Sequence, residues 1–190
     1  MVGAGRDLSI LATAKHFAGY GASIGGRDFD QANLSDTELW NTHLPPFKAA
    51  IDAGVGSLMS AYMPLNDVPA SANHRLLTEV LRDAWDFKGF VISDNHSVHS
   101  LVTQGYAKDP GDAAAAALNA GLDMEMFAMP PAAYSRLPEA LNSGKIEIQS
   151  LDRAVRRVLI AKIRLGLNRM EQDQKVYLPI VELANDTPFG

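Results

Sequence analysis

Polar side chains with catalytic potential stand at the ends of four short apolar runs of the sequence. They are Lys15 and His16 in the first run, Tyr62 in the second, Asp94 in the third, and Asp123 with Glu125 in the fourth. A carboxylate can attack an anomeric carbon, and lysine, histidine or tyrosine can hold sugar hydroxyls or steady a neighbouring anion. Parallel strands in an α/β barrel bring such residues together at their carboxyl ends. The pattern therefore predicts a sugar pocket.

Each of these residues also has an interpretation without a role in such a pocket. Asp94 could cap a helix or stabilise a loop, and His16 could be a structural hydrogen-bonding residue. Lys15 could be a solvated charge or a Schiff-base lysine, as in barrel aldolases. Asp123 and Glu125 alternate with methionines, so a core or capping role is as well supported as a catalytic one. Spacing alone leaves these alternatives open.

The sequence predicts no metal ion and no cofactor. Its five histidines form no H-E-x-x-H motif, and the pair His96 and His99 is a weak indication of a metal. Cysteine is absent, which excludes disulfides, thiolate ligands and a cysteine nucleophile.

Composition points to one folded domain with a small or uncharged ligand. The chain has 190 residues, of which 47% are hydrophobic and 21% charged, and its net charge is -5. Without a Lys/Arg cluster, nucleic acid and anionic membranes are not expected as partners. The sequence has neither a signal-peptide pattern at its start nor an apolar stretch long enough for a membrane span. The compartment stays open.

Strand and helix patterns alternate along the chain. Strands are expected at 8–17, 55–62, 89–94 and 122–126. Helices are expected from Ser35 to Gly54 with a kink at Pro45 and Pro46, from Asn73 to Trp85, from Asp109 to Gly121, from Tyr134 to Asn142, and from Ser150 to Gly166. Strands that alternate with helices form a parallel sheet, so the fold class is α/β.

The count of units predicts half of a TIM-type (β/α)8 barrel. Four β/α units occupy about 165 residues, whereas a closed barrel has eight units in about 250 residues. An open doubly wound sheet fits the same count but normally carries a glycine-rich phosphate turn, and none fits here. The domain is expected to span residues 1–168. Residues 169–190, with the motif YLPIVEL, are expected to be a tail or linker containing a short strand.

Five ordered blocks of the sequence resemble family 3 glycoside hydrolases, especially β-glucosidases. They are AKHFAGYG at 14–21, LPPFKAAIDAGVGSLMSAY at 44–62, LLTEVLRDAWDFKGFVISD at 76–94, AGLDMEM at 120–126 and LDRAVRRVLIAKIRLGL at 151–167. The resemblance covers residues 8–168. It implies that the four strands are the fifth to eighth strands of the barrel.

The resemblance also implies roles for the residues at the strand ends. Asp94 corresponds to the nucleophile, which forms a covalent glycosyl intermediate in a retaining reaction. Lys15 and His16 correspond to the pair that binds substrate hydroxyls, and Tyr62 to the tyrosine that closes the sixth strand. The acid/base carboxyl group usually belongs to a following domain. Asn95 stands where tryptophan is common.

The loop after the first strand reads GYGASIGGRDFD. It lacks the Asp-Ser-His loop of the family's N-acetylglucosaminidase branch, which disfavours that branch. Spacing assigns no role to Arg27 or Asp28 in this loop.

The implied partner is a β-glucoside or oligosaccharide substrate. Four strands leave two open sheet edges, so we expect a homodimer or a longer protein that supplies the other barrel half and the second domain. The alternative is a truncated half barrel that is inactive or only binds sugar.

Overall fold

The fold is built on a small parallel sheet. The computed structural model describes residues 10–128 and 130–167. Its parallel sheet has the order β1-β2-β5, with β1 at Thr13–Phe17, β2 at Ser57–Ser60 and β5 at Phe90–Ile92. Ser57 pairs with Thr13 on one side and with Phe90 on the other. The predicted α/β class with parallel strands is therefore confirmed.

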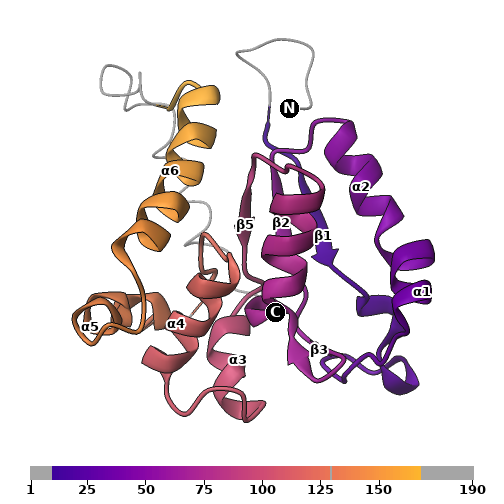
Figure 1. The fold of residues 1–190 in the computed structure, drawn as a ribbon, viewed down its shortest axis with the longest axis horizontal. Coiled ribbons are helices and arrows are strands. Elements are labelled where there is room, and N and C mark those ends of the chain that lie inside the picture. Colours follow the sequence, from indigo (N-terminus) through magenta and orange to yellow (C-terminus); the bar gives the residue numbers. More distant parts are fainter. Residues whose placement is uncertain (1–9, 129, 168–190) are drawn as a thin grey trace, which may run out of the picture.

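Helices cover the sheet and its edges (Figure 1). Figure 1 shows α2 beside β1 and α6 on the opposite side, toward β5. The short helix α1 (Asp36–Glu38) continues directly into η4 (Leu39–His43). The longer helical segments are α2 (Pro45–Asp52), η6 (Arg75–Ala84), α3 (Ser97–Thr103), α4 (Pro110–Ala120), α5 (Leu137–Asn142) and α6 (Ile148–Arg164). Four single turns complete them: η2 (Tyr20–Ala22), η3 (Ile24–Gly26), η5 (Ala70–Ala72) and η7 (Ala133–Arg136).

Capping side chains begin the helices where the sequence predicts them. The hydroxyl of Ser35 accepts a hydrogen bond from the Glu38 amide at 3.1 Å, and the Asp109 carboxylate accepts one from the Asp112 amide at 2.8 Å. Pro45 occupies the first turn of α2, so the proline pair restarts a helix there. Gly121 ends α4 with a φ of 110°.

The fourth predicted strand is where the sequence prediction was wrong. Residues 122–126 contain no regular strand: they form an isolated parallel bridge between Met124 and Ile92, and the carbonyls of Met124 and Met126 accept hydrogen bonds from the amides of Ser93 and His96. The amides of Asp123 and Met124 both donate to the same carbonyl, that of Val91, at 2.9 and 3.1 Å. In a regular parallel ladder, successive amides donate to different carbonyls of the neighbouring strand. Because two adjacent amides share one carbonyl here, the segment lies beside β5 but does not form a regular strand.

Neither the hairpin after β2 nor the helix after Asp94 was predicted. A two-stranded antiparallel hairpin, β3 (Pro64–Leu65) and β4 (Val68–Pro69), follows β2. Helix α3 follows Asp94. The buried hydroxyl of Ser71 joins these parts, because it hydrogen-bonds to Ser60 in β2 at 2.8 Å and to Ser97 in α3 at 2.7 Å.

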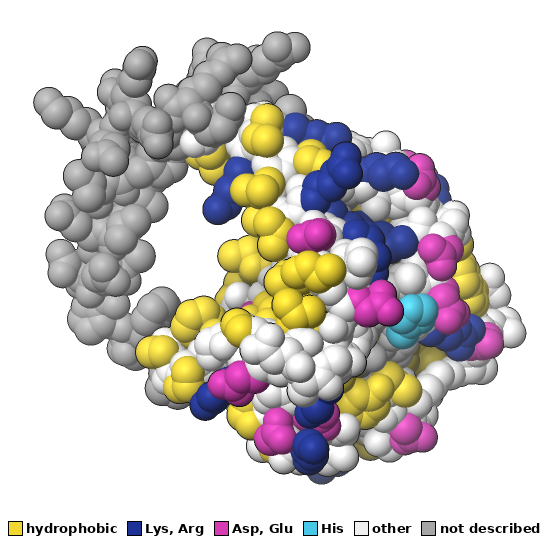
Figure 2. Space-filling view, turned by 60° about the vertical axis from the view of Figure 1, so that its left-hand side comes forward, with side chains coloured by type: hydrophobic (Ala, Val, Ile, Leu, Met, Phe, Trp, Pro, Cys, Tyr) yellow, Lys and Arg dark blue, Asp and Glu magenta, His cyan; other side chains and the backbone are white. Residues whose placement is uncertain are grey.

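Helix α6 carries an exposed apolar stripe. Val155, Leu159 and Ile163 are spaced four residues apart and are each about half exposed. Figure 2 shows hydrophobic side chains gathered on one face of the molecule, beside a group of Lys and Arg. The predicted tail, residues 169–190, lies outside the described residues, and the boundary at 168 stays a prediction.

Candidate active site at the carboxyl ends of the strands

The structure brings His16 and Asp94 together. His16 lies in β1 and Asp94 follows β5, and the His16 Nε2 atom is 3.3 Å from Asp94 Oδ2. The other carboxylate oxygen of Asp94 accepts a hydrogen bond from the Asn95 amide at 2.7 Å. Both side chains are partly accessible, at 25% for His16 and 18% for Asp94. Asp94 is thus an oriented carboxylate that a ligand can reach.

Tyr62 belongs to the same group of residues. Burial, followed by the negative charges of Asp94 and Asp28, raises the pKa of the Tyr62 hydroxyl. An interaction of this kind requires both carboxylates to lie near the phenol. A neutral Tyr62 hydroxyl beside Asp94 can donate a hydrogen bond to the carboxylate or to a bound hydroxyl.

Lys15, unlike His16 next to it in β1, forms no ion pair with Asp94. Its side chain is exposed, and it forms no ion pair or hydrogen bond with any residue that the structure describes. The two peptide bonds Lys15–His16 and Phe17–Ala18 are cis. The role of Lys15 in binding stays a prediction.

The loop after β1 adds residues that sequence reasoning did not assign. The Tyr20 hydroxyl donates to the Asp28 carboxylate, and the Tyr20 ring meets the His16 ring edge-on with centroids 5.2 Å apart. Phe29 meets the Tyr62 ring with centroids 4.8 Å apart. The only sequence signal for these residues was their place in a long loop at the carboxyl end of a strand, where barrel sites are built.

Asp123 is tied into the framework of the fold. Its side chain is 1% exposed and accepts hydrogen bonds at 2.8 Å from Arg82, from Arg157 and from the Val91 amide. Burial raises the pKa of Asp123 despite these cations, and burial lowers the pKa of Arg82 to about 10. This network joins η6, β5 and α6.

Glu125 also has structural contacts. Its carboxylate accepts hydrogen bonds from the amides of Ala133 and Tyr134, at 3.0 and 2.7 Å. These bonds fix the start of η7. Both carboxylates of the fourth run therefore have the core or capping contacts that were one of their two interpretations.

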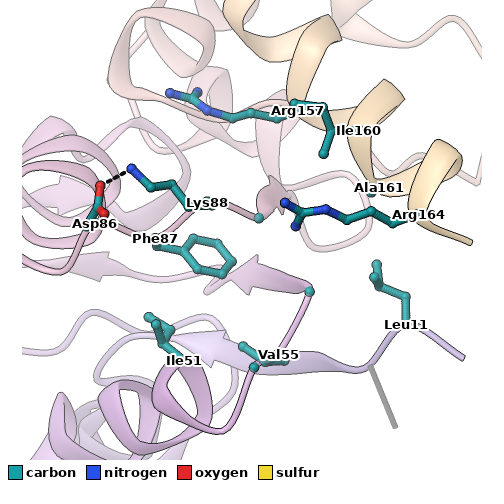
Figure 3. Close-up of a pocket in the computed structure, with 13 residues that line it drawn as sticks. Leu11, Ile51, Val55, Asp86, Phe87, Lys88, Arg157, Ile160, Ala161 and Arg164 are labelled. Carbon is teal, nitrogen blue, oxygen red and sulfur yellow. Dashed lines mark hydrogen bonds and ion pairs between the residues drawn. The ribbon is translucent and has the colours of Figure 1, made fainter. Parts of the chain in front are cut away.

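A separate cavity of about 430 Å³ lies between the amino-terminal side of the sheet and α6 (Figure 3). Leu11, Val55 and Phe87 form its apolar part, and Arg157 and Arg164 reach it from α6. Apart from α6 and Ile51 of α2, its walls come from the segments that precede β1, β2 and β5, at the end of the sheet opposite to Asp94. It is therefore distinct from the candidate active site.

Residues 10–128 and 130–167 have neither a metal-binding cluster nor a membrane-spanning helix. No cluster of three or more His, Asp or Glu side chains in this range could hold a metal ion. None of the helices there has the length and apolarity to cross a bilayer.

The parallel sheet with its helices places the chain in the α/β class, and the barrels of this class carry their active sites at the carboxyl ends of the strands. The family follows from comparison with known proteins. Residues 1–161 match the model of the glycosyl hydrolase family 3 N-terminal domain, and the chain belongs to this family. Its fold is accordingly of the TIM-barrel type.

The similar proteins are β-glucosidases and β-xylosidases. A periplasmic β-glucosidase of Salmonella typhimurium is 43% identical over 160 residues, which is 84% of this chain and 20% of that protein. A β-xylosidase of Formosa agariphila is 37% identical over 83% of this chain and 23% of its own length. The crystal structure of a β-glucosidase from Listeria innocua superposes with a TM-score of 0.82 at 36% identity, over 88% of this chain and 23% of that one.

The chain spans about a fifth of the length of these relatives. The family-model match nevertheless establishes the family and the barrel-type fold of this part. The similar proteins are glycoside hydrolases.

Proposed function

We propose that the chain carries the nucleophile of a retaining glycoside hydrolase that removes terminal β-D-glucosyl or closely related residues. The observation that carries the proposal is the pair formed by His16 and Asp94, 3.3 Å apart at the carboxyl ends of β1 and β5. Family membership and the β-glucosidase relatives support the same reaction.

In the proposed first step, an oxygen of Asp94 bonds to the anomeric carbon, and the bond from that carbon to the leaving oxygen breaks. The leaving oxygen takes a proton from a second carboxyl group, for which we propose a following domain. Water then attacks the glycosyl ester, the second carboxylate takes its proton, and Asp94 is released. Two displacements retain the anomeric configuration.

His16 and Tyr62 would assist these steps without becoming covalently bonded. The imidazole Nε2 of His16, 3.3 Å from Asp94, can orient the carboxylate, and the ring can hold a sugar hydroxyl. Tyr62 stays neutral because its pKa is raised, so it can donate to the ring region of the sugar. Lys15, at the same strand end, is proposed to bind a further hydroxyl when substrate is present.

We also propose that the four β/α units, ending near residue 168, form the second half of the barrel, strands five to eight. A half barrel has open strand edges, and the apolar stripe on α6 is exposed. Completion by the rest of a longer protein, or by a second copy, would cover these surfaces. Sedimentation of the isolated chain as a monomer at micromolar concentration would argue against the need for such a partner.

Replacing Asp94 by asparagine tests the proposal. The variant should lose turnover of an aryl β-glucoside by about a thousandfold or more, because an amide cannot form the glycosyl ester. Asp52→Asn is the matched control, since Asp52 is an exposed carboxylate on α2 paired with Lys48. Full activity in Asp94→Asn, with Asp52→Asn also active, would refute the proposal. An aryl β-xyloside assayed in parallel gives the sugar preference.

A further inference from the structure

We infer that Ser71 is a positioning residue for the proposed nucleophile, because it fixes the turn that carries Asp94 to the neighbouring strand β2. This inference rests on the proposed function, since it concerns the reactivity of the same carboxylate. Ser71 is 1% exposed, so it would act without touching a substrate. It acts through two further serines, Ser60 and Ser97.

Asp94 begins a tight turn that leads into α3. The amide of Ser97, the first residue of α3, donates a hydrogen bond to the Asp94 carbonyl at 3.1 Å. Within the turn, the Asn95 amide donates to the Asp94 carboxylate at 2.7 Å, and His96 has a φ of 58°. A residue other than glycine is uncommon in this left-handed region and is kept there by the surrounding structure. The direction of the Asp94 carboxylate therefore depends on what holds the two ends of the turn.

Ser93 holds the near end of the turn. Its hydroxyl donates to the Asp94 carbonyl at 2.8 Å and accepts a hydrogen bond from the Met126 amide, also at 2.8 Å. Ser93 is completely buried. These bonds tie the residue before the nucleophile to the segment beside β5, and they leave the far end of the turn, at Ser97, to be held by other contacts.

A chain of three buried hydroxyls holds the far end. The Ser97 Oγ atom lies 2.7 Å from Ser71 Oγ, which in turn lies 2.8 Å from Ser60 Oγ in β2. Ser60 is 0% exposed, and Ser71 and Ser97 are each 1% exposed. A serine hydroxyl donates one hydrogen bond and can accept others, so Ser71 in the middle can serve both neighbours at once. Because water does not reach these groups, a hydroxyl that loses its partner here stays unpaired, which is unfavourable.

Helix α3 is tied to the end of β2 a second time. Gln104, just after the helix, donates from its side-chain amide to the Tyr62 carbonyl at 3.1 Å. Both ends of α3 are thus fixed to the stretch that carries Tyr62, which itself belongs to the candidate site. Of these two links, the one through Ser71 is the link that reaches the turn of Asp94.

The loss of the Ser71 hydroxyl would release the turn without removing the carboxylate. Ser60 and Ser97 would lose their shared partner, while Ser93 would still hold the near end. A misplacement of about 1 Å caused by a change away from the reacting atoms can slow a reaction about a hundredfold. Because one of the two ends stays fixed, we expect a loss of about tenfold in the rate of attack by Asp94.

The test combines kinetics with hydrogen exchange in the complete protein. Ser71→Ala should lower kcat for an aryl β-glucoside about tenfold and change KM by about twofold or less, because the sugar's binding contacts remain. By mass spectrometry, amides in residues 94–100 should exchange about tenfold faster than in the unsubstituted protein. Thr78→Val is the matched control, since it removes a 2.8 Å hydrogen bond to the Ala120 carbonyl, which joins η6 to α4. It should change neither kcat nor exchange in residues 94–100.

A double variant tests whether the serines act as one chain. Ser71→Ala combined with Ser97→Ala should lose no more activity than the larger single loss, because both changes remove the same bond. Losses that multiply would contradict the inference. If Ser71→Ala does not fold, Ser97→Ala removes that bond from its other end and is judged by the same criteria.

Unchanged exchange in residues 94–100 of Ser71→Ala would overturn the inference, and so would faster exchange with an unchanged kcat. If the unsubstituted protein turns over no β-glucoside, the proposed function fails. Hydrogen exchange then still decides whether Ser71 holds the turn, so the two failures are distinguishable.

Discussion

Replacing Asp123 by asparagine should destabilise the folded chain by about 3–5 kcal/mol, because it breaks a buried charge network. The carboxylate accepts three hydrogen bonds at 2.8 Å, two of them from guanidinium groups. Asparagine has one acceptor oxygen, and its amide group would point donors at an arginine. The Arg82 side chain is 10% exposed, so its charge would remain buried without an anion.

Urea unfolding, followed by the fluorescence of Trp40 and Trp85, measures this loss. The midpoint should fall while the slope stays the same, as expected when only stability changes. The double variant Arg82→Met with Asp123→Leu removes both buried charges, and it should recover most of the loss. Arg157 would then be free to turn toward solvent, since its side chain is 25% exposed.

Asp86→Asn is the control for this experiment. Asp86 pairs with Lys88, but both side chains are exposed, and such pairs contribute about 0–1 kcal/mol. A loss below about 1 kcal/mol in Asp123→Asn would refute the reasoning about burial, because 1 kcal/mol is the level expected for an exposed pair.

Three further predictions concern caps and surface charge. Ser35→Ala removes an N-cap acceptor and should cost about 1 kcal/mol in urea unfolding, and an unchanged midpoint would contradict the cap. Gly121→Ala should lower the free energy of unfolding by about 1–3 kcal/mol, because the φ of Gly121 is +110° and an added Cβ would lie 2.8 Å from Thr78 Oγ1. An unaltered melting temperature would be evidence against this strain. The hydrogen bond from Lys145 lowers the pKa of Asp112 in the folded protein. The stability that this bond contributes is therefore fully present above about pH 4, the pKa of an unfolded aspartate, and is lost as the pH falls through the lower folded-state pKa. Lys145→Met should move this pKa up toward its ordinary value in an NMR titration, and no movement would exclude the assigned cause.

The sequence predicted the elements whose ends are determined locally. Ser35, Asp109 and Gly121 act within one turn of their own helix, so capping rules find them without knowledge of the fold. Helix α3 was missed because its sequence, SVHSLVT, is short and rich in serine and β-branched residues, which have low helix propensity. The burial of Val98 and Leu101 stabilises it instead.

The fourth strand was overpredicted for a related reason. The motif LDMEM alternates apolar and acidic residues as a strand does. Its carboxylates are used otherwise: Asp123 binds Arg82 and Arg157, which are distant in sequence, and Glu125 binds the amides at the start of η7. The pair of His16 and Asp94 could be anticipated because both follow apolar runs. The contacts of Tyr20, Asp28 and Phe29 could not, since an irregular loop has no period that reveals which side chains turn inward.

The most direct test of the account is the mass of the intact protein after incubation with a 2-deoxy-2-fluoro β-glucoside that has a good leaving group. This reagent transfers its fluorosugar to the nucleophile, and the glycosyl ester that results hydrolyses slowly. It therefore marks the nucleophile even without an acid/base residue. We expect a single glycosyl adduct, located at Asp94 after proteolysis. A folded, complete protein that gains no adduct, or gains it on another residue, would contradict the central claim.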